Sequence, residues 1–210
     1  MGVLESLGEI IGIYHGPYGE ENAHTTVYGR ESADHLYGVQ NSLSADHIYG
    51  FGGNDYINAY QGNDIIDAGS GDDVIRGGQG MDEMTGGPGF DEFRFSVGDS
   101  GPDYNHADII WDWDVTSDVI SFDNILGSPN TYYEEFFNSD GTLEGAYNQA
   151  LSMAQHDIGH FSDGSNFTAF YTDGHNGYLF ADNNLNGRVD TGIELRGVTS
   201  LDQFNWSDMI

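Results

Sequence analysis

Single apolar residues recur every nine positions through the first half of the chain, and each follows an aspartate by two residues. From Gly50 onward, five consecutive copies read GFGGNDYIN, AYQGNDIID, AGSGDDVIR, GGQGMDEMT and GGPGFDEFR, and the last copy ends at Arg94. The aspartate holds position six of each copy and the apolar residue holds position eight. Self-similarity at this period predicts a parallel β-helix, in which every repeat contributes one short strand and one turn.

Two further copies precede Gly50. NSLSADHIY fits at 41–49 and GRESADHLY fits at 29–37, with the three residues Gly38–Gln40 inserted between them. A degenerate copy at 20–28 has Thr25 where the aspartate is expected. Position six is held by Asp34, Asp46, Asp55, Asp64, Asp73, Asp82 and Asp91, a set named the aspartate column below. Position eight is held by Leu36, Ile48, Ile57, Ile66, Ile75, Met84 and Phe93.

Each residue type in the repeat has a physical reason. A three-residue strand buries one apolar side chain, and glycines at positions two and four allow the tight turn that precedes it, because they tolerate positive φ and close backbone approach. The turn carbonyls and the aspartate carboxylate form an all-oxygen ligand set, which suits Ca²⁺ better than Mg²⁺. Two repeats make one coil, so positions eighteen apart stack, and an ion can bridge successive coils. Folding and ion binding should therefore be cooperative.

The second half of the chain changes character. The segment 91–95 reads as a closing strand, and the alternation of Ile109, Trp111 and Trp113 predicts a half-buried strand. Residues 142–156 have apolar positions at helical spacing. Strands are expected at 167–172 and 178–182, joined by a turn at Asp173-Gly174.

The charge balance narrows the choice of partners. The sequence holds 35 acidic residues and five basic ones, all arginine, for a formal net charge of -30. Nucleic acids and anionic membranes are unexpected partners, because binding to them depends on Lys and Arg. The chain has no cysteine and no apolar run of membrane-spanning length, and its first 18 residues lack the basic region of a signal peptide. Metal cations are the natural counter-charge.

The repeats at 50–94 resemble the RTX, or haemolysin-type calcium-binding, family, and Gly77–Asp82 and Gly86–Asp91 match its motif outright. The resemblance implies that carbonyls at positions two and four and the aspartate of one repeat face carbonyls at positions one and three and the aspartate two repeats later. It implies about four Ca²⁺ sites. These would be Ser42, Ser44 and Asp46 with Ala59, Gln61 and Asp64; Phe51, Gly53 and Asp55 with Ala68, Ser70 and Asp73; Tyr60, Gly62 and Asp64 with Gly77, Gln79 and Asp82; and Gly69, Gly71 and Asp73 with Gly86, Pro88 and Asp91. The copies that carry Asp34 and Asp46 have serine at position four, and no site is assigned to Asp34.

The segments 106–114 and 117–126 resemble those that follow the repeats in serralysin C-terminal domains and alginate epimerase R-modules. The last 29 residues resemble the tail of proteins exported by type I (ABC) exporters. We therefore expect an all-β dominated fold. A parallel β-roll (a right-handed β-helix of nonapeptide repeats) at 29–94 would follow an N-terminal cap at 1–28, and an antiparallel β cap with one α-helix would occupy 95–210.

Three other features admit a functional interpretation. The loop Asp182–Gly187, with Asp190 behind it, is spaced like the start of an EF-hand and is either a polar hairpin turn or a weak extra Ca²⁺ site. The run from His156 to His160 resembles a zinc-protease motif, but it has Asp157 where Glu would act. The tyrosines Tyr28, Tyr37, Tyr49, Tyr56 and Tyr60 would form either a sugar platform or a packing ladder between coils.

The expected function is that of a secreted, non-catalytic Ca²⁺-binding protein that folds outside the cell, exported without an N-terminal signal peptide. The alternatives are an extracellular adhesin or polysaccharide-binding module, and an enzyme that modifies polysaccharide or is related to proteases.

Overall fold

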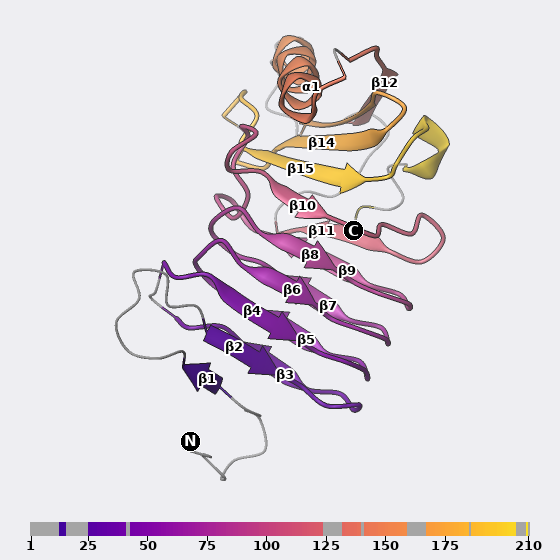
Figure 1. The fold of residues 1–210 in the computed structure, drawn as a ribbon. Helices are drawn as coiled ribbons and strands as arrows, with labels where there is room; N and C mark the ends of the chain where they lie inside the picture. Colours follow the sequence, from indigo (N-terminus) through magenta and orange to yellow (C-terminus); the bar gives the residue numbers. More distant parts are fainter. Residues whose placement is uncertain are drawn as a thin grey trace.

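The computed structural model describes residues 13–15, 25–40, 43–123, 132–139, 141–158, 167–184, 186–204 and 209. Its rungs stack in one direction, from β1 near the N-terminus to the helix α1 and its sheet at the other end (Figure 1). Two sheets run along this stack, and successive repeats alternate between them.

The first sheet has ten strands in the order β1-β2-β4-β6-β8-β10-β15-β14-β13-β12, and the second has five in the order β11-β9-β7-β5-β3. The strands of the first sheet are β1 (Ile13–His15), β2 (Thr25–Tyr28), β4 (Asp46–Tyr49), β6 (Ile65–Asp67), β8 (Glu83–Thr85), β10 (Asp108–Ile110), β12 (Tyr132–Phe136), β13 (Phe167–Thr172), β14 (Asn176–Asp182) and β15 (Thr191–Arg196). Those of the second are β3 (His35–Tyr37), β5 (Tyr56–Asn58), β7 (Val74–Arg76), β9 (Glu92–Phe95) and β11 (Val119–Phe122).

Parallel pairing in register brings equivalent repeat positions together. Ile48 pairs with Ile66, and Ile66 with Met84, in the first sheet. Ile57 and Ile75 pair in the same way in the second sheet. Every position-eight side chain is at most 1% exposed, so the two sheets enclose a single apolar core. The structure confirms the parallel β-roll.

The turns show why the repeat needs glycine at position two. Gly69, Gly78 and Gly87 hold φ between 94° and 101°, which L-residues with a side chain rarely adopt. Phe51 and Tyr60 occupy the same position with φ of 72° and 75°. Two aromatic residues therefore sit in left-handed backbone where the motif prefers glycine.

The roll passes into the cap without a break in the sheets. β10 pairs in parallel with both β8 and β15, and β11 pairs in parallel with β9. The segment ending at Phe95 is therefore not the closing strand that the sequence suggested, since β11 follows it in the second sheet and β10 adds a further strand beside β8 in the first. β13, β14 and β15 pair antiparallel, and β12 joins β13 in parallel.

The cap carries the expected helix as α1 (Leu143–Ile158). Its Tyr147 is fully buried and meets the rings of Tyr178 and Phe180 edge-on, with centroid distances of 5.8 and 5.3 Å. A short 3-10 helix, η1 (Leu201–Gln203), follows β15. Among the described residues, no helix is long and apolar enough to cross a membrane.

The expectation for Ile109, Trp111 and Trp113 was wrong in its phase. The structure buries Ile110 and Trp113, whereas Trp111 is 46% exposed and lies under the guanidinium of Arg196, 4.9 Å from its carbon to the ring centroid. β10 ends at Ile110, so the alternation does not continue through Trp113. Side-chain spacing alone could not reveal that the strand stops there.

Candidate metal centre

The aspartate column forms two hydrogen-bonded files, one before each sheet. In every step the backbone N–H of one aspartate donates to Oδ1 of the aspartate in the next coil. The bonds in the first file join Asp46 to Asp64 (2.6 Å) and Asp64 to Asp82 (2.8 Å). The second file joins Asp34, Asp55, Asp73 and Asp91 by bonds of 2.8, 2.7 and 3.0 Å. These bonds fix each carboxylate toward the gap between two stacked turns.

One carboxylate oxygen of almost every aspartate in the column is buried without a hydrogen-bond partner. These atoms are Oδ1 of Asp46 and Oδ2 of Asp55, Asp64, Asp73, Asp82 and Asp91. The residues that carry them are at most 2% exposed. A buried carboxylate oxygen without a partner is costly unless the group is protonated or binds a cation.

Burial changes the acidity of these groups. Loss of solvation, joined by repulsion from neighbouring aspartates, raises the pKa of Asp55, Asp64 and Asp91 to about 7, although a backbone hydrogen bond opposes the change. The same causes raise the pKa of Asp73, and they raise that of Asp82 well above its usual value. Without a cation the folded roll therefore favours protonated carboxyls.

Backbone carbonyls share the gap with these oxygens. A Cβ added at Gly50 would overlap both the carbonyl oxygen of Ala68 and Oδ2 of Asp55, so the two oxygens face one small space. A Cβ at Gly62 would lie 2.6 Å from both the carbonyl oxygen of Ser44 and Oδ1 of Asp64. Carbonyl and carboxylate oxygens that converge on a space kept open by glycine fit a hard cation such as Ca²⁺.

The predicted ligands fall into two groups according to the structure. The carbonyls at positions two and three bond across the gap: Phe51 accepts from Ser70, Tyr60 from Gln79, and the carbonyls of Ser70, Gln79 and Pro88 accept from Gly53, Gly62 and Gly71. Each of these oxygens keeps a second lone pair for an ion. The position-four carbonyls of Gly53, Gly62 and Gly71, and the position-two carbonyl of Gly69, point at the glycine two repeats later.

The remaining predicted ligands are placed as follows. Ala59 presents its carbonyl beside Oδ2 of Asp46, at the point where a Cβ on Gly38 would lie. Gly77 and Gly86 lie against the Oδ2 atoms of Asp82 and Asp91. Gln61 pairs with Gln79 in a parallel bridge, and Ser42 lies outside the described residues.

The absence of a predicted site at Asp34 has a structural counterpart. Arg30 holds this carboxylate through its Nε (3.0 Å) and Nη2 (2.5 Å) to Oδ1, and through its backbone N–H (2.6 Å) to Oδ2. Among the described residues, Asp34 is the one member of the aspartate column that pairs with an arginine. A guanidinium thus supplies the counter-charge at this end of the roll.

Sequence reasoning missed two aspartates that extend the files. Asp82 donates to Asp108 (2.8 Å) and Asp91 donates to Asp118 (3.2 Å). Both carry the signal of the repeat, because an apolar residue, Ile110 or Ile120, follows two positions later. The spacing of 26 and 27 residues in place of 18 concealed them.

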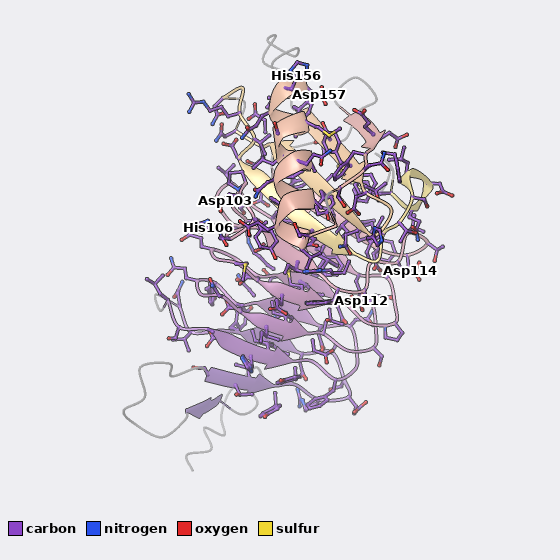
Figure 2. All side chains as sticks on the ribbon, turned by 45° about the horizontal axis from the view of Figure 1, so that its top comes forward. Asp103, His106, Asp112, Asp114, His156 and Asp157 are labelled. Atoms are coloured by element: carbon purple, nitrogen blue, oxygen red, sulfur yellow. The ribbon has the colours of Figure 1, made fainter. Side chains whose placement is uncertain are left out.

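The zinc-protease-like motif at the end of α1 is engaged in local contacts. Asp157 accepts a hydrogen bond from the hydroxyl of Tyr171 (2.6 Å), and the second histidine of its motif, His160, lies outside the described residues. Figure 2 shows His156 and Asp157 at the far end of α1, away from Asp112 at the end of the roll. Among the described residues, no three His, Cys, Asp or Glu side chains gather as a metal site. An ion bound in the roll must therefore also use backbone carbonyl oxygens.

The loop after β14 folds as a tight polar turn. Both oxygens of Asp182 accept backbone N–H groups, from Asn186 (3.1 Å) and Gly187 (2.8 Å). The side chain of Asn186 donates to Asp190 (3.0 Å). The structure therefore supplies the hydrogen bonds expected of a hairpin turn.

Stacked turns, a buried aspartate column and converging carbonyls define a parallel β-roll with a repeated oxygen site. Residues 42–66 and 58–93 match the family model of the RTX calcium-binding nonapeptide repeat (4 copies), and this match supports a calcium-binding β-roll in that part of the chain.

Two solved structures from Azotobacter vinelandii are also similar to the chain. The AlgE6R2 subunit of a mannuronan C5-epimerase has 22% identity and a TM-score of 0.38, with 87% of this chain and 90% of that one covered. The AlgE6R3 subunit has 20% identity and a TM-score of 0.29, with 95% and 84% covered. No curated protein matches the chain.

Proposed function

We propose that this chain is an extracellular protein whose β-roll is stable only when its aspartate column is neutralised by Ca²⁺, and that it leaves the cell through a type I (ABC) exporter. The observation that carries the folding proposal is the set of six buried, unpartnered carboxylate oxygens in the column. With a net charge of -30, the unneutralised chain repels itself and stays expanded. An expanded chain suits passage through a narrow exporter.

When bound, Ca²⁺ supplies the positive charge and the oxygen coordination that the buried carboxylates lack. The chain supplies the rest. Glycines at positions two and four let stacked turns approach, and the Asp-to-Asp hydrogen bonds orient each carboxylate toward the gap. Because a coil cannot bury its strand face alone, adjacent sites should fill cooperatively.

Circular dichroism in Ca²⁺ and after chelation tests this proposal. We expect the β signal to fall in EDTA and to return with added Ca²⁺. The measurement should be made at pH 8, above the pKa of about 7 that Asp55, Asp64 and Asp91 have in the folded roll. A β spectrum and a thermal midpoint that do not respond to chelation would overturn the proposal.

A second candidate function, binding of a polysaccharide, is favoured by one cleft on the roll. The cleft encloses about 320 Å³ and is lined by Gln40, Asn58, Tyr60, Gln61, Arg76, Gly78, Gln79 and Asp99. Tyr60 stacks on Tyr37, with ring centroids 6.1 Å apart and 20° between the ring planes. An aromatic face beside amide and charged groups can bind the apolar face and the hydroxyls of a sugar ring.

The backbone of Tyr60 makes a clean test available. Because Tyr60 holds left-handed φ, Tyr60→Gly restores the residue that the repeat prefers and removes only the ring. We expect the variant to fold in Ca²⁺ and to lose binding to neutral oligosaccharides on a glycan array. Phe51→Gly makes the same backbone change at a residue outside the cleft lining and is the matched control. Silence of the unmodified protein across neutral glycans would exclude this function.

A further inference from the structure

The roll contains one more stacked turn than its recognisable repeats. In the repeats, the N–H of the position-four glycine donates to the position-three carbonyl of the next coil, as Gly62 does to Gln79 (2.9 Å). Gly80 donates in the same way to the carbonyl of Asp99 (3.3 Å), and it forms a parallel bridge with Ser100. The segment 98–101 therefore stacks on the last turn of the first file.

The new turn also has residues that correspond to positions two and six of the repeat. Gly98 has φ of 84°, within the range of 72° to 101° that position two adopts from Phe51 to Gly87, although no atom of the preceding coil lies where its Cβ would be. Asp108 takes position six, because it accepts the N–H of Asp82 at 2.8 Å and begins β10. Residues 102–107 form an insertion between these two parts. The final coil is therefore eight residues longer than a regular one, with two extra residues before Gly98 and six at 102–107.

This coil leaves carboxylate oxygens without partners. Within the repeats, the gap between Asp64 and Asp82 uses Oδ1 of Asp82, which accepts the N–H of Asp64. Oδ2 of Asp82 is then left for the next gap, where Asp108 follows. Oδ2 of Asp82 and Oδ2 of Asp108 are both buried and unpartnered, and both residues are 0% exposed.

Among the described residues, no arginine pairs with Asp82 or Asp108, and Arg76 pairs instead with Asp99 of the new turn (3.1 Å). The N–H of Asp108 donates to Oγ of Ser100 (2.8 Å), which donates to the carbonyl of Gly192 (2.6 Å), so the file ends in neutral groups. Two fully buried carboxylates one hydrogen bond apart call for a cation.

We propose that a further Ca²⁺ site lies in this gap, between the turn 78–82 and the turn 98–108. Its ligands would be the carboxylates of Asp82 and Asp108 with the carbonyls of Gly80 and Asp99. The site rests on the proposed calcium-dependent folding but adds a position that no recognisable repeat supplies. Because β10 pairs with both β8 and β15, this ion would fasten the roll to the cap.

The matching end of the second file is built differently. Both oxygens of Asp118 accept N–H groups, from Asp91 (3.2 Å) and Asp114 (2.8 Å). Asp112 caps the last glycine turn by accepting from Gly86 (3.0 Å) and Gly87 (2.8 Å). Oδ2 of Asp91 is unpartnered, as Oδ2 of Asp82 is, but both oxygens of Asp118 across its gap are bound by the backbone, so the proposal is confined to the first file.

Ion counting by native mass spectrometry and equilibrium dialysis tests the site on the full chain. Asp108→Asn keeps an Oδ1 acceptor for the N–H of Asp82 and removes the charged ligand. We expect it to bind one Ca²⁺ fewer than the unmodified protein. Glu194→Gln removes another buried carboxylate, on the neighbouring strand β15, and should leave the number of ions unchanged.

Asp64→Asn, inside the repeats, separates the two proposals. If Asp64→Asn loses ions and Asp108→Asn binds as many as the unmodified protein, the further site is wrong while calcium-dependent folding stands. If the unmodified protein binds no Ca²⁺, both proposals fail. Should Asp108→Asn not fold, crystals of the unmodified protein grown in Tb³⁺ decide the matter. An anomalous peak between Asp82 and Asp108 is expected, and peaks in the repeats without one there would overturn the site.

Discussion

The backbone N–H of Asp82 lies 2.8 Å from Oδ1 of Asp108, across 26 residues of sequence. The bond from Asp64 to Asp82 has the same length and spans 18 residues. The file of aspartates therefore continues through the point at which the repeats end. The roll and the cap are joined through this file as well as through their shared sheet, so conditions that act on the aspartates should act on both.

Removal of Ca²⁺ should unfold the roll. If each site has a dissociation constant of about 0.1 mM, millimolar Ca²⁺ contributes about 1.4 kcal/mol per site, and four sites contribute on the order of 5–6 kcal/mol. That is comparable to the whole stability of a small domain. Urea titrations in Ca²⁺ and in EDTA measure the difference, and a change in the free energy of unfolding below about 1 kcal/mol would contradict the expectation.

The metal-free protein should be more stable in mild acid than at neutral pH. The folded-state pKa of Asp55, Asp64 and Asp91 is raised to about 7, above that of the unfolded chain, so between about 4 and 7 the folded state binds more protons. Stability in EDTA should therefore fall as the pH rises through this window. In Ca²⁺ the trend should reverse, because protons compete with the ion. Thermal midpoints at pH 5 and pH 8, with and without EDTA, check both signs.

Two members of the aspartate column should differ sharply in their effect on calcium affinity. Asp73→Asn removes a carboxylate with a buried free oxygen, and we expect Ca²⁺ affinity to fall by tenfold or more. Asp34→Asn removes one that Arg30 already neutralises, and the affinity should change by less than threefold. Isothermal titration calorimetry on the two variants provides the comparison, and equal losses would contradict the assignment of the ion-binding stretch.

Close stacking of the turns should make Gly78 sensitive to any side chain. A Cβ at Gly78, where φ is 101°, would overlap the carbonyl of Tyr60 in the coil before it. Gly78→Ala should therefore cost on the order of 2–3 kcal/mol, through strain and separation of the turns. Gly141→Ala is the matched control, because Gly141 has φ of 81° and open space around it, and it should cost only about 1 kcal/mol. Urea denaturation of both variants in Ca²⁺ measures the contrast.

The fold of the roll could be predicted from the sequence because each repeat contains the residues that specify its own strand and turn. Asp64 and Ile66 mark the start and the core position of one strand, and the same pair recurs every nine residues. A nearest-neighbour architecture makes these local signals sufficient, since every coil contacts only the coils beside it. The helix at 143–158 and the strands at 167–172 and 176–182 were also predictable within two residues, because their periodicity or turn chemistry is strong.

The candidate site was predictable in its chemistry but not in its extent. The position-six aspartates and the turn glycines gave the oxygen site. Asp108 and Asp118 were not predicted as members of the files, because insertions displace them from the period of nine. The strands after them nevertheless pair in register. The sequence also mispredicted which faces of Ile109 and Trp111 are buried. Their burial depends on pairing with β15, a strand more than 80 residues later.

The repeat, the residue types at each turn position and the acidity that favours Ca²⁺ are all set within nine residues, so they can be read from the amino-acid sequence. The folded chain was needed to show which aspartates stack on which, that Arg30 takes the place of an ion at Asp34, and that the first file continues to Asp108 inside the cap. Those relationships depend on distances between residues that insertions separate in sequence and that sheet pairing brings together.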